Sequence, residues 1–188
     1  KANQVLIPLE KLYRRYTGES LAVKLSDFAD VSERIQYLVT QVEEITKIDN
    51  FGAYLTAMLE IDAFFMNEDR HTNNIAVIYN EKTQKYELSP FFDQGLCMFA
   101  DINQDYPIDQ SLEYCLEKIE AKPFSSDFDI QLDAAEELYG IQIGFQFTFK
   151  DIQIYLQKNS ENYPREVIRR VEQLLRRQMR KYGYLIKK

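Results

Sequence analysis

The chain has 188 residues, of which 45% are hydrophobic and 28% charged, and it contains 12 Phe and 13 Tyr. This composition excludes a disordered or fibrous protein, and the length suits one globular domain, 1–188, that needs neither a disulfide nor a structural metal to fold. The net charge of −7 is uneven, because residues 163–188 carry +7 and the rest of the chain carries −14, so most of the surface would repel nucleic acid.

The first part of the chain is predicted to be helical. Pro8 and Gly18 bracket a segment with apolar residues at helical spacing, and they are the residue types that favour the start and the end of a helix. Asp30 and Glu33 match a capping box ahead of a second such segment. Tyr54–Phe65 is so dense in apolar residues that we expect a helix buried on nearly all sides.

Strand-forming residues gather in one place. Ile75–Tyr79 is a compact β-prone run, Asn80–Lys85 is polar, and Tyr86–Leu88 resumes the pattern before Pro90, which predicts a β-hairpin. Later helices are expected over Leu112–Glu120, Phe128–Leu138, Lys150–Gln157 and Pro164–Lys181. The sequence therefore predicts a mainly α fold (α+β), a helical bundle with one β-hairpin, and its six glycines form no glycine-rich phosphate-binding loop.

Acidic residues on the predicted helices fall into two groups. We expect Glu43, Glu44 and Glu60 to lie on solvated helix faces. Asp62 instead lies within the apolar helix, and a buried carboxylate needs partners. We therefore expect Asp62 to bind Arg70 or the amides of the following loop.

Polar residues flank the hairpin on both sides. Asp69 and Asn74 stand in the loop after the apolar helix, and Asp93 opens an Asp-x-Gly step after the hairpin. Phosphoryl transfer needs such a set, because one carboxylate must accept the proton of the attacking hydroxyl while further oxygens hold Mg²⁺ against a polyphosphate. We expect Gly95 to let the backbone turn away without a Cβ clash. The alternative is that these Asp and Asn residues simply occupy turns, where both are common.

The order of these residues resembles a known family. Asn67-x-Asp69-Arg70-His71-x-x-Asn74, followed by Phe92-Asp93-x-Gly95, resembles the C-terminal lobe of HipA-like kinases. The resemblance covers about Tyr54–Phe124 and is strongest to the branch of small bacterial Ser/Thr kinases whose loop reads Asp-Arg-His. A Lys122-Pro123-Phe124 step also resembles that branch.

This resemblance implies a protein-kinase-like C-terminal lobe that uses ATP and Mg²⁺ to phosphorylate Ser or Thr of a protein substrate. It implies that Asp69 is the catalytic base and that Asn74 and Asp93 bind Mg²⁺. The further residues that it implies are Ala76 and Phe92 beside the nucleotide, and Asn67, Arg70, His71 and Gly95 as structural residues of the catalytic loops.

The chain departs from the family in two respects. HipA-like kinases have an N-terminal ATP-binding lobe with a phosphate-contacting loop and a lysine that pairs with the phosphates, and no segment here has either role. Since the chain also begins at Lys1 rather than a methionine, we expect a C-terminal lobe separated from its N-terminal lobe. Gln94 occupies a position where other kinases often carry Phe, which weighs against a regulated flip of this loop.

The expected partners are a protein substrate, the absent N-terminal lobe and, if the protein is a toxin, an antitoxin-like regulator. Two other interpretations stay open: a non-catalytic pseudokinase, or a helical module that binds a partner and has no nucleotide site. The basic helix within 163–188 either packs on the acidic body with its charges solvated or binds an anionic partner such as nucleic acid.

The two cysteines, Cys97 and Cys115, are expected to be free thiols in a reducing, cytoplasmic setting. With one His and two Cys, the chain lacks the soft ligands of a typical zinc site, so a metal should be a hard cation held by oxygen atoms. No uncharged run approaches the ~20 residues of a membrane span, and the first residues do not resemble a secretory signal. We therefore expect no membrane partner.

Overall fold

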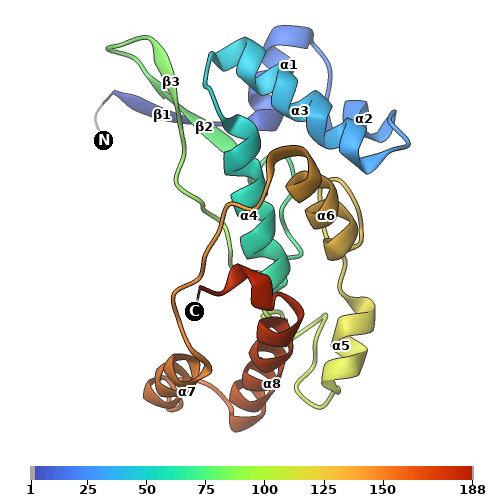
Figure 1. The fold of residues 1–188 in the computed structure, drawn as a ribbon, viewed down its shortest axis with the longest axis vertical. Helices are drawn as coiled ribbons and strands as arrows, with labels where there is room; N and C mark the ends of the chain where they lie inside the picture. Colours follow the sequence, from blue (N-terminus) through green and yellow to red (C-terminus); the bar gives the residue numbers. More distant parts are fainter. Residues whose placement is uncertain (1–2, 188) are drawn as a thin grey trace.

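A computed structural model describes residues 3–187 as a mainly helical fold with one small antiparallel sheet (Figure 1). The strands are β1 (Gln4–Pro8), β2 (Ala76–Asn80) and β3 (Lys85–Leu88). The helices are α1 (Leu9–Thr17), α2 (Leu21–Ser26), α3 (Val31–Thr46), α4 (Phe51–Phe65), α5 (Leu112–Lys118), α6 (Phe128–Tyr139), α7 (Phe149–Lys158) and α8 (Arg165–Lys181), followed by a 3₁₀ turn over Gly183–Leu185. The predicted helices are confirmed, whereas the short α2 was not predicted.

The sheet has the order β1-β2-β3. The predicted hairpin is confirmed as the β2–β3 pair, in which Tyr79 lies opposite Tyr86. The expectation that strands are confined to this hairpin is wrong, because β1 pairs antiparallel with β2 and sets Leu6 opposite Ile78. Three apolar residues before a proline are too short a pattern to identify a strand, and the partner of β1 lies far along the chain.

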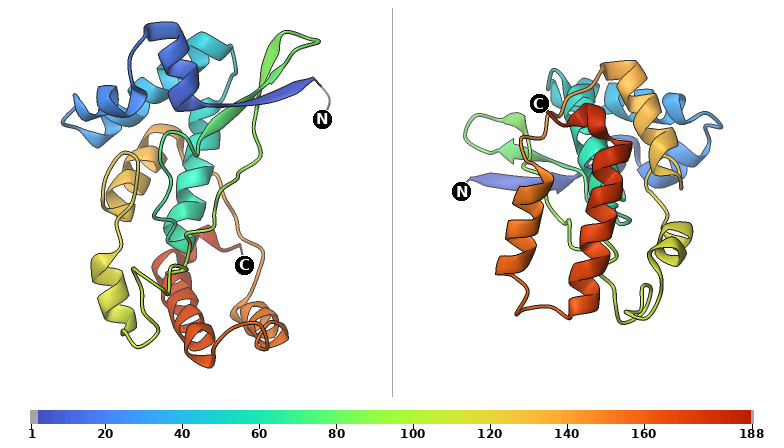
Figure 2. Two further views of the ribbon diagram at one scale, coloured as in Figure 1. Left: turned by 180° about the vertical axis from the view of Figure 1, so that it is seen from behind. Right: turned by 60° about the horizontal axis from the view of Figure 1, so that its bottom comes forward.

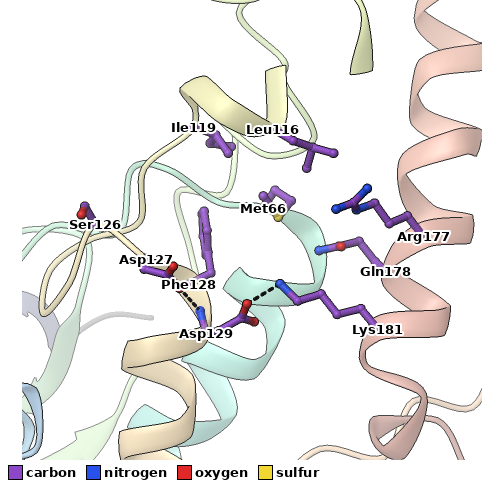
Figure 3. A pocket seen from close by; sticks show the side chains of 10 residues that line it. All are labelled: Met66, Leu116, Ile119, Ser126, Asp127, Phe128, Asp129, Arg177, Gln178 and Lys181. Atoms are coloured by element: carbon purple, nitrogen blue, oxygen red, sulfur yellow. Dashed lines mark hydrogen bonds and ion pairs between the residues drawn. The ribbon is translucent and has the colours of Figure 1, made fainter. Parts of the chain in front are cut away.

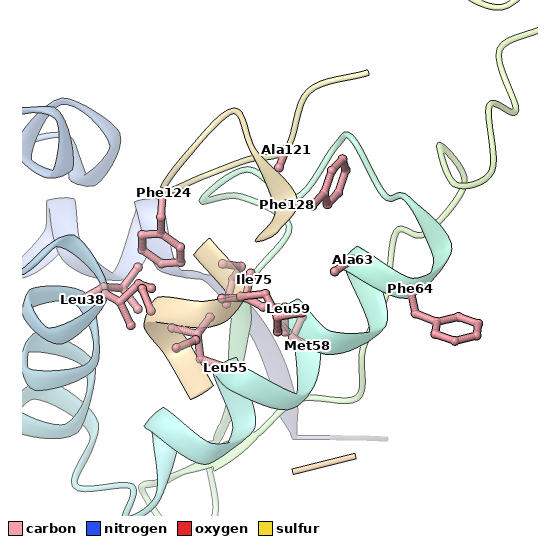
Figure 4. Packing of buried hydrophobic residues seen from close by; sticks show 14 of the residues in the cluster. Leu38, Leu55, Met58, Leu59, Ala63, Phe64, Ile75, Ala121, Phe124 and Phe128 are labelled. Atoms are coloured by element: carbon pink, nitrogen blue, oxygen red, sulfur yellow. The ribbon is translucent and has the colours of Figure 1, made fainter. Parts of the chain in front are cut away.

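Helix α4 runs through the middle of the molecule, as the views in Figures 1 and 2 show. It packs against α3, α6 and α8. Its Leu55 and Leu59 are fully buried, together with Leu38 of α3, Ile75 and Phe124 (Figure 4). The expectation of a helix buried on nearly all sides is therefore confirmed, and the loop that leaves its C-terminal end starts from a rigid support.

Two helix ends follow the residue types that predicted them. Helix α1 begins directly after Pro8 and ends at Gly18, whose φ of 83° lies in the left-handed region that glycine adopts without a Cβ penalty. At the start of α3 the Asp30 carboxylate accepts a hydrogen bond from the backbone N–H of Glu33 at 3.0 Å. The N-cap half of the predicted capping box is thereby present.

One prediction about the acidic residues is wrong. Glu60 is fully buried, and its two carboxylate oxygens accept the backbone N–H groups of Gln142 and Ile143 at 2.8 and 2.6 Å. The physical reason is that a helix buried on all sides has no solvated face. Glu60 therefore accepts hydrogen bonds from the backbone of the connection after α6. Glu43 is partly buried and accepts the N–H of Phe51 at 2.9 Å, while Glu44 is exposed as expected.

The basic helix α8 packs on the rest of the molecule through polar as well as apolar residues. Arg170 is buried and donates to the carbonyl oxygens of Tyr106 and Pro107 at 2.9 and 2.6 Å. Gln178 is also buried and donates to the carbonyl of Ala63 at 2.8 Å. The arginines left exposed on this helix are Arg165, Arg169, Arg176, Arg177 and Arg180.

Two features of residues 3–187 concern the cysteines and the length of the helices. Cys97 and Cys115 are free thiols, and Cys115 is buried. None of the helices over these residues combines the length and the apolar composition needed to cross a bilayer.

Candidate active site

A buried ion pair supports the loop between α4 and β2. Arg70 donates from Nε to Asp62 Oδ2 at 2.7 Å and from Nη2 to Asp62 Oδ1 at 2.9 Å, and the side chains are 0% and 1% exposed. Asn67 adds a third donor to the same carboxylate at 2.7 Å. Burial raises the pKa of Asp62, and the bonds from Arg70 and Asn67 act against that rise. The expected contact between Asp62 and Arg70 is confirmed.

The same guanidinium joins the two segments that carry the candidate site. Arg70 Nη1 donates to the carbonyl oxygen of Asn74 at 2.7 Å and to that of Phe92 at 3.0 Å. Asn74 ends the loop after α4, and Phe92 precedes Asp93 beyond the hairpin. Because one nitrogen bonds both carbonyls, the loop and the Asp-x-Gly step are held side by side.

Asp69 lies at the surface of this assembly. Its side chain is 28% exposed, and its backbone N–H donates to Asn67 Oδ1 at 3.3 Å. Asn74 Nδ2 donates to the backbone oxygen of Asp69 at 2.9 Å and to its Oδ2 at 3.4 Å. Two side-chain nitrogen atoms, His71 Nε2 and Lys122 Nζ, lie 3.8 and 3.6 Å from Asp69 Oδ1.

His71 takes part in the loop itself. Its Nδ1 accepts the backbone N–H of Asn73 at 3.2 Å, and its side chain is 43% exposed. Its backbone closes the turn as well, because its N–H donates to the Asp69 carbonyl and its own carbonyl accepts the N–H of Asn74. These contacts suit the structural role expected for His71.

Asp93 is exposed and makes no hydrogen bond to another residue between 3 and 187. Its φ of 55° places it in the left-handed region, which Asp tolerates better than most residues. The expectation that Gly95 provides the turn is wrong, because Gly95 has no positive φ and a Cβ added there would meet nothing within 4 Å. The backbone turns instead at Asp93, Met98 and Phe99, where φ is positive.

The oxygen atoms available for a hard cation are few. Asn74 uses its amide nitrogen toward Asp69, and the described residues hold no buried side-chain oxygen or nitrogen without a partner, so the unbonded Asn74 Oδ1 reaches solvent. With the exposed carboxylate of Asp93, it provides the kind of ligand that Mg²⁺ prefers. No group of three or more His, Cys, Asp or Glu residues within 3–187 could hold a metal. A cation bound here would need phosphate oxygens or water to complete its coordination.

The two residues expected beside a nucleotide differ in their access to solvent. Ala76 opens β2 and is fully buried, so it presents no surface to a ligand, and that expectation is not supported. Phe92 is partly exposed beside Asp93.

Two cavities of the molecule lie apart from the proposed base and metal ligands, although Gly95 lines the second of them. One of about 180 Å³ lies between α6, α8 and the end of α5, and an ion pair between Lys181 and Asp129 borders it (Figure 3). Another, of about 360 Å³, lies between the segment from Gln94 to Ile102 and the α7–α8 helices. Neither is lined by Asp69, Asn74 or Asp93.

Lys122 lies near Asp69, and the spacing of residues in the sequence did not predict this contact. It lies after α5, distant in the sequence from the loop, and no local spacing connects the two. The Lys122-Pro123-Phe124 step was the one signal that pointed to this segment.

The arrangement of the helices, the three-stranded sheet and the polar loops has a counterpart in a solved kinase structure, so the fold is kinase-like. Among solved structures, the chain is similar to the crystal structure of the Helicobacter pylori proinflammatory kinase CtkA, with a TM-score of 0.59. The similarity covers 96% of this chain and 69% of the CtkA chain at 14% sequence identity. Neither models of protein families nor curated protein sequences give a match.

Proposed function

We propose that this chain is the catalytic C-terminal lobe of a HipA-like Ser/Thr kinase, which transfers the terminal phosphoryl group of ATP to Ser or Thr hydroxyls of a protein. The observation that carries the proposal is the Arg70 guanidinium, which bonds Asn74 and Phe92 and so holds Asn74 beside the Asp93 segment. The Asp-Arg-His-x-x-Asn loop and the kinase-like fold support the same assignment.

The residues of the chain have distinct tasks in this proposal. Asp69 is partly exposed, so a substrate hydroxyl can reach its carboxylate, which orients the hydroxyl and accepts its proton. Asn74 Oδ1 and the Asp93 carboxylate are the oxygens that would hold Mg²⁺. Bound Mg²⁺ supplies neutralisation of the charge that develops on the transferred phosphoryl group. Arg70 stays in the interior and keeps the two loops at a fixed separation.

The proposed partners are a protein substrate and an N-terminal ATP-binding lobe, with an antitoxin-like regulator if the protein acts as a toxin in the cytoplasm. An N-terminal lobe is proposed because these 188 residues contain no glycine-rich phosphate loop. The acidic body of the chain supports a protein rather than a nucleic acid as substrate, because it would repel a phosphate backbone.

Thermal unfolding with and without Mg²⁺ and ATP tests the proposal. A ligand at 100 times its Kd adds about 2.7 kcal/mol to the free energy of unfolding, which raises the midpoint by several degrees. Asp93→Ala should abolish the rise. Asp109→Ala, an exposed Asp without a hydrogen bond to another described residue, is the matched control and should keep it.

Phosphate transfer from ATP to a protein then separates an enzyme from a pseudokinase. The chain joined to its N-terminal lobe should label a protein substrate, and Asp69→Asn should lose that activity while it keeps the nucleotide-dependent rise. Nucleotide binding without transfer would favour the pseudokinase, and no binding in either form would favour the helical partner-binding module.

A further inference from the structure

Lys122 carries an ammonium group beside the candidate site, and the proposed function assigns this group no role. Lys122 Nζ lies 3.6 Å from Asp69 Oδ1, and its side chain is 51% exposed. Within residues 3–187 Lys122 forms no other ion pair. Burial raises the pKa of the Glu68 carboxyl, and a hydrogen bond from Tyr106 and the charges of Lys122 and Lys118 act against that rise.

The backbone that carries Lys122 is fixed by buried groups. Gln131, 1% exposed, donates to the Lys122 carbonyl at 3.1 Å and accepts the N–H of Phe124 at 3.3 Å. Arg34 donates to the Phe124 carbonyl at 2.6 Å. The segment therefore presents a long cationic side chain from a fixed base toward Asp69.

Folding stability does not explain this placement. An exposed ion pair contributes little to stability, because water screens it and the long side chain loses conformational freedom. Nor do the other cations at the site replace Lys122. Arg70 is fully buried and its nitrogens are used by Asp62, Asn74 and Phe92, and His71 carries a charge only when it is protonated.

The positive charge of Lys122 suits it to bind a phosphate group. Asp69 and the exposed Asp93 carry carboxylates at the candidate site, and a carboxylate repels the triphosphate of ATP. A flexible ammonium on the solvent side of Asp69 can turn from the carboxylate toward a phosphate oxygen and offset that repulsion. Lysine is suited to this role because it presents a compact charge with three donors on a flexible stem.

We propose that Lys122 binds the γ-phosphate of ATP and is a catalytic residue of the phosphoryl transfer, an inference that rests on the proposed function. In the reaction the substrate oxygen forms a bond to the γ-phosphorus, the bond from that phosphorus to the β–γ bridging oxygen breaks, and ADP leaves with the electron pair. The proton of the hydroxyl goes to Asp69. Lys122 keeps its proton and stabilises the negative oxygens of the transferred group.

The test compares two nucleotides that differ at the γ-phosphate. Affinities for Mg²⁺-ADP and for a non-hydrolysable Mg²⁺-ATP analogue are measured by calorimetry on the wild type, Lys122→Met and Lys122→Arg. Loss of a charge-assisted hydrogen bond should weaken the ATP analogue about tenfold in Lys122→Met, with little change for ADP. Lys122→Arg should recover part of that loss, which a merely structural role would not predict.

Lys118→Met is the matched control. Lys118 is similarly exposed, but its ammonium binds Asp105 at 2.7 Å, so its removal should leave both affinities unchanged. Equal affinities of wild type and Lys122→Met for the ATP analogue, or equal weakening of both nucleotides, would overturn the role of Lys122 and leave the proposed function intact. Failure of the wild type to bind either nucleotide, both as this chain alone and joined to its N-terminal lobe, would overturn the proposed function and this inference with it.

Turnover gives the second readout. In the two-lobed protein, Lys122→Met should lower kcat by about 100-fold, as the loss of one donor to a developing oxyanion does, and should change the KM for the protein substrate much less. An unchanged kcat would contradict the assignment.

Discussion

Arg70→Met removes the group on which both the stability of the loop and the geometry of the candidate site depend. The side chains of Arg70 and Asp62 are 0% and 1% exposed. Met has about the length of the arginine stem but cannot bond Asp62, Asn74 or Phe92. The variant therefore leaves a buried carboxylate without its cation and two carbonyl oxygens without their donor.

The expected loss of stability follows from that burial. Removal of one partner of a buried ion pair costs about 3–5 kcal/mol, and in a chain of this length each kcal/mol lowers the midpoint by about 2–4 °C. Thermal unfolding should therefore show a fall of at least roughly 6 °C. Asp62→Asn combined with Arg70→Met removes both charges and should recover a large part of the loss, since no uncompensated charge remains.

The free energy of unfolding of Arg70→Met should also depend on pH, and the pKa of Asp62 gives the direction of that dependence. Burial raises the pKa of Asp62, and without Arg70 the rise becomes larger. A carboxyl whose pKa is raised in the folded state favours folding when it is protonated, so Arg70→Met should lose stability as the pH rises through that pKa. Denaturant unfolding at pH 5 and at pH 8 measures the difference. A loss below about 1 kcal/mol at pH 8, or the same loss in the double variant, would refute the reasoning.

Three smaller predictions follow from other parts of the structure. Gly95→Ala should leave the thermal midpoint nearly unchanged, whereas Gly18→Ala should cost about 1 kcal/mol, because only Gly18 has a positive φ; equal effects would contradict this. Glu60→Ala removes a fully buried carboxylate that accepts two backbone N–H groups, and it should cost about 2–4 kcal/mol in denaturant unfolding. Burial raises the pKa of the Cys97 thiol to about 12, so alkylation of the native protein followed by mass spectrometry should label it slowly at pH 8 and faster toward pH 10; rapid labelling at pH 8 would refute this.

The helices were predictable because their signals are local. The periodicity of Tyr54–Phe65 and the turn residues Pro8 and Gly18 act within a few positions of the element that they define. The hairpin was predictable for the same reason. β1 was not, since Val5–Ile7 forms a strand through its pairing with β2, and the intervening chain gives no indication of that pairing.

In the candidate site, too, the features that are local in the sequence were predictable and the contacts between distant segments were not. The loop residues Asp69, His71 and Asn74 lie within one short segment, so their spacing could be read directly from the sequence. The contact of Arg70 with Phe92 and that of Lys122 with Asp69 depend on the packing of segments that are distant in the sequence. Glu60 was misjudged because its partners, Gln142 and Ile143, come from a distant connection.

The buried ion pair between Asp62 of α4 and Arg70 of the following loop shows how the stability of this fold and its chemistry are related. Apolar side chains of similar volume would stabilise an interior as well as Asp62 and Arg70 do, or better. They could not, however, donate to the carbonyl oxygens of Asn74 and Phe92, which Arg70 does while Asp62 fixes its orientation. The charged pair therefore does more than stabilise the fold, because it holds the segment before the hairpin beside the segment after it. The carboxylate of Asp62 in an otherwise apolar helix is for this reason the feature of the sequence that already indicates the pair.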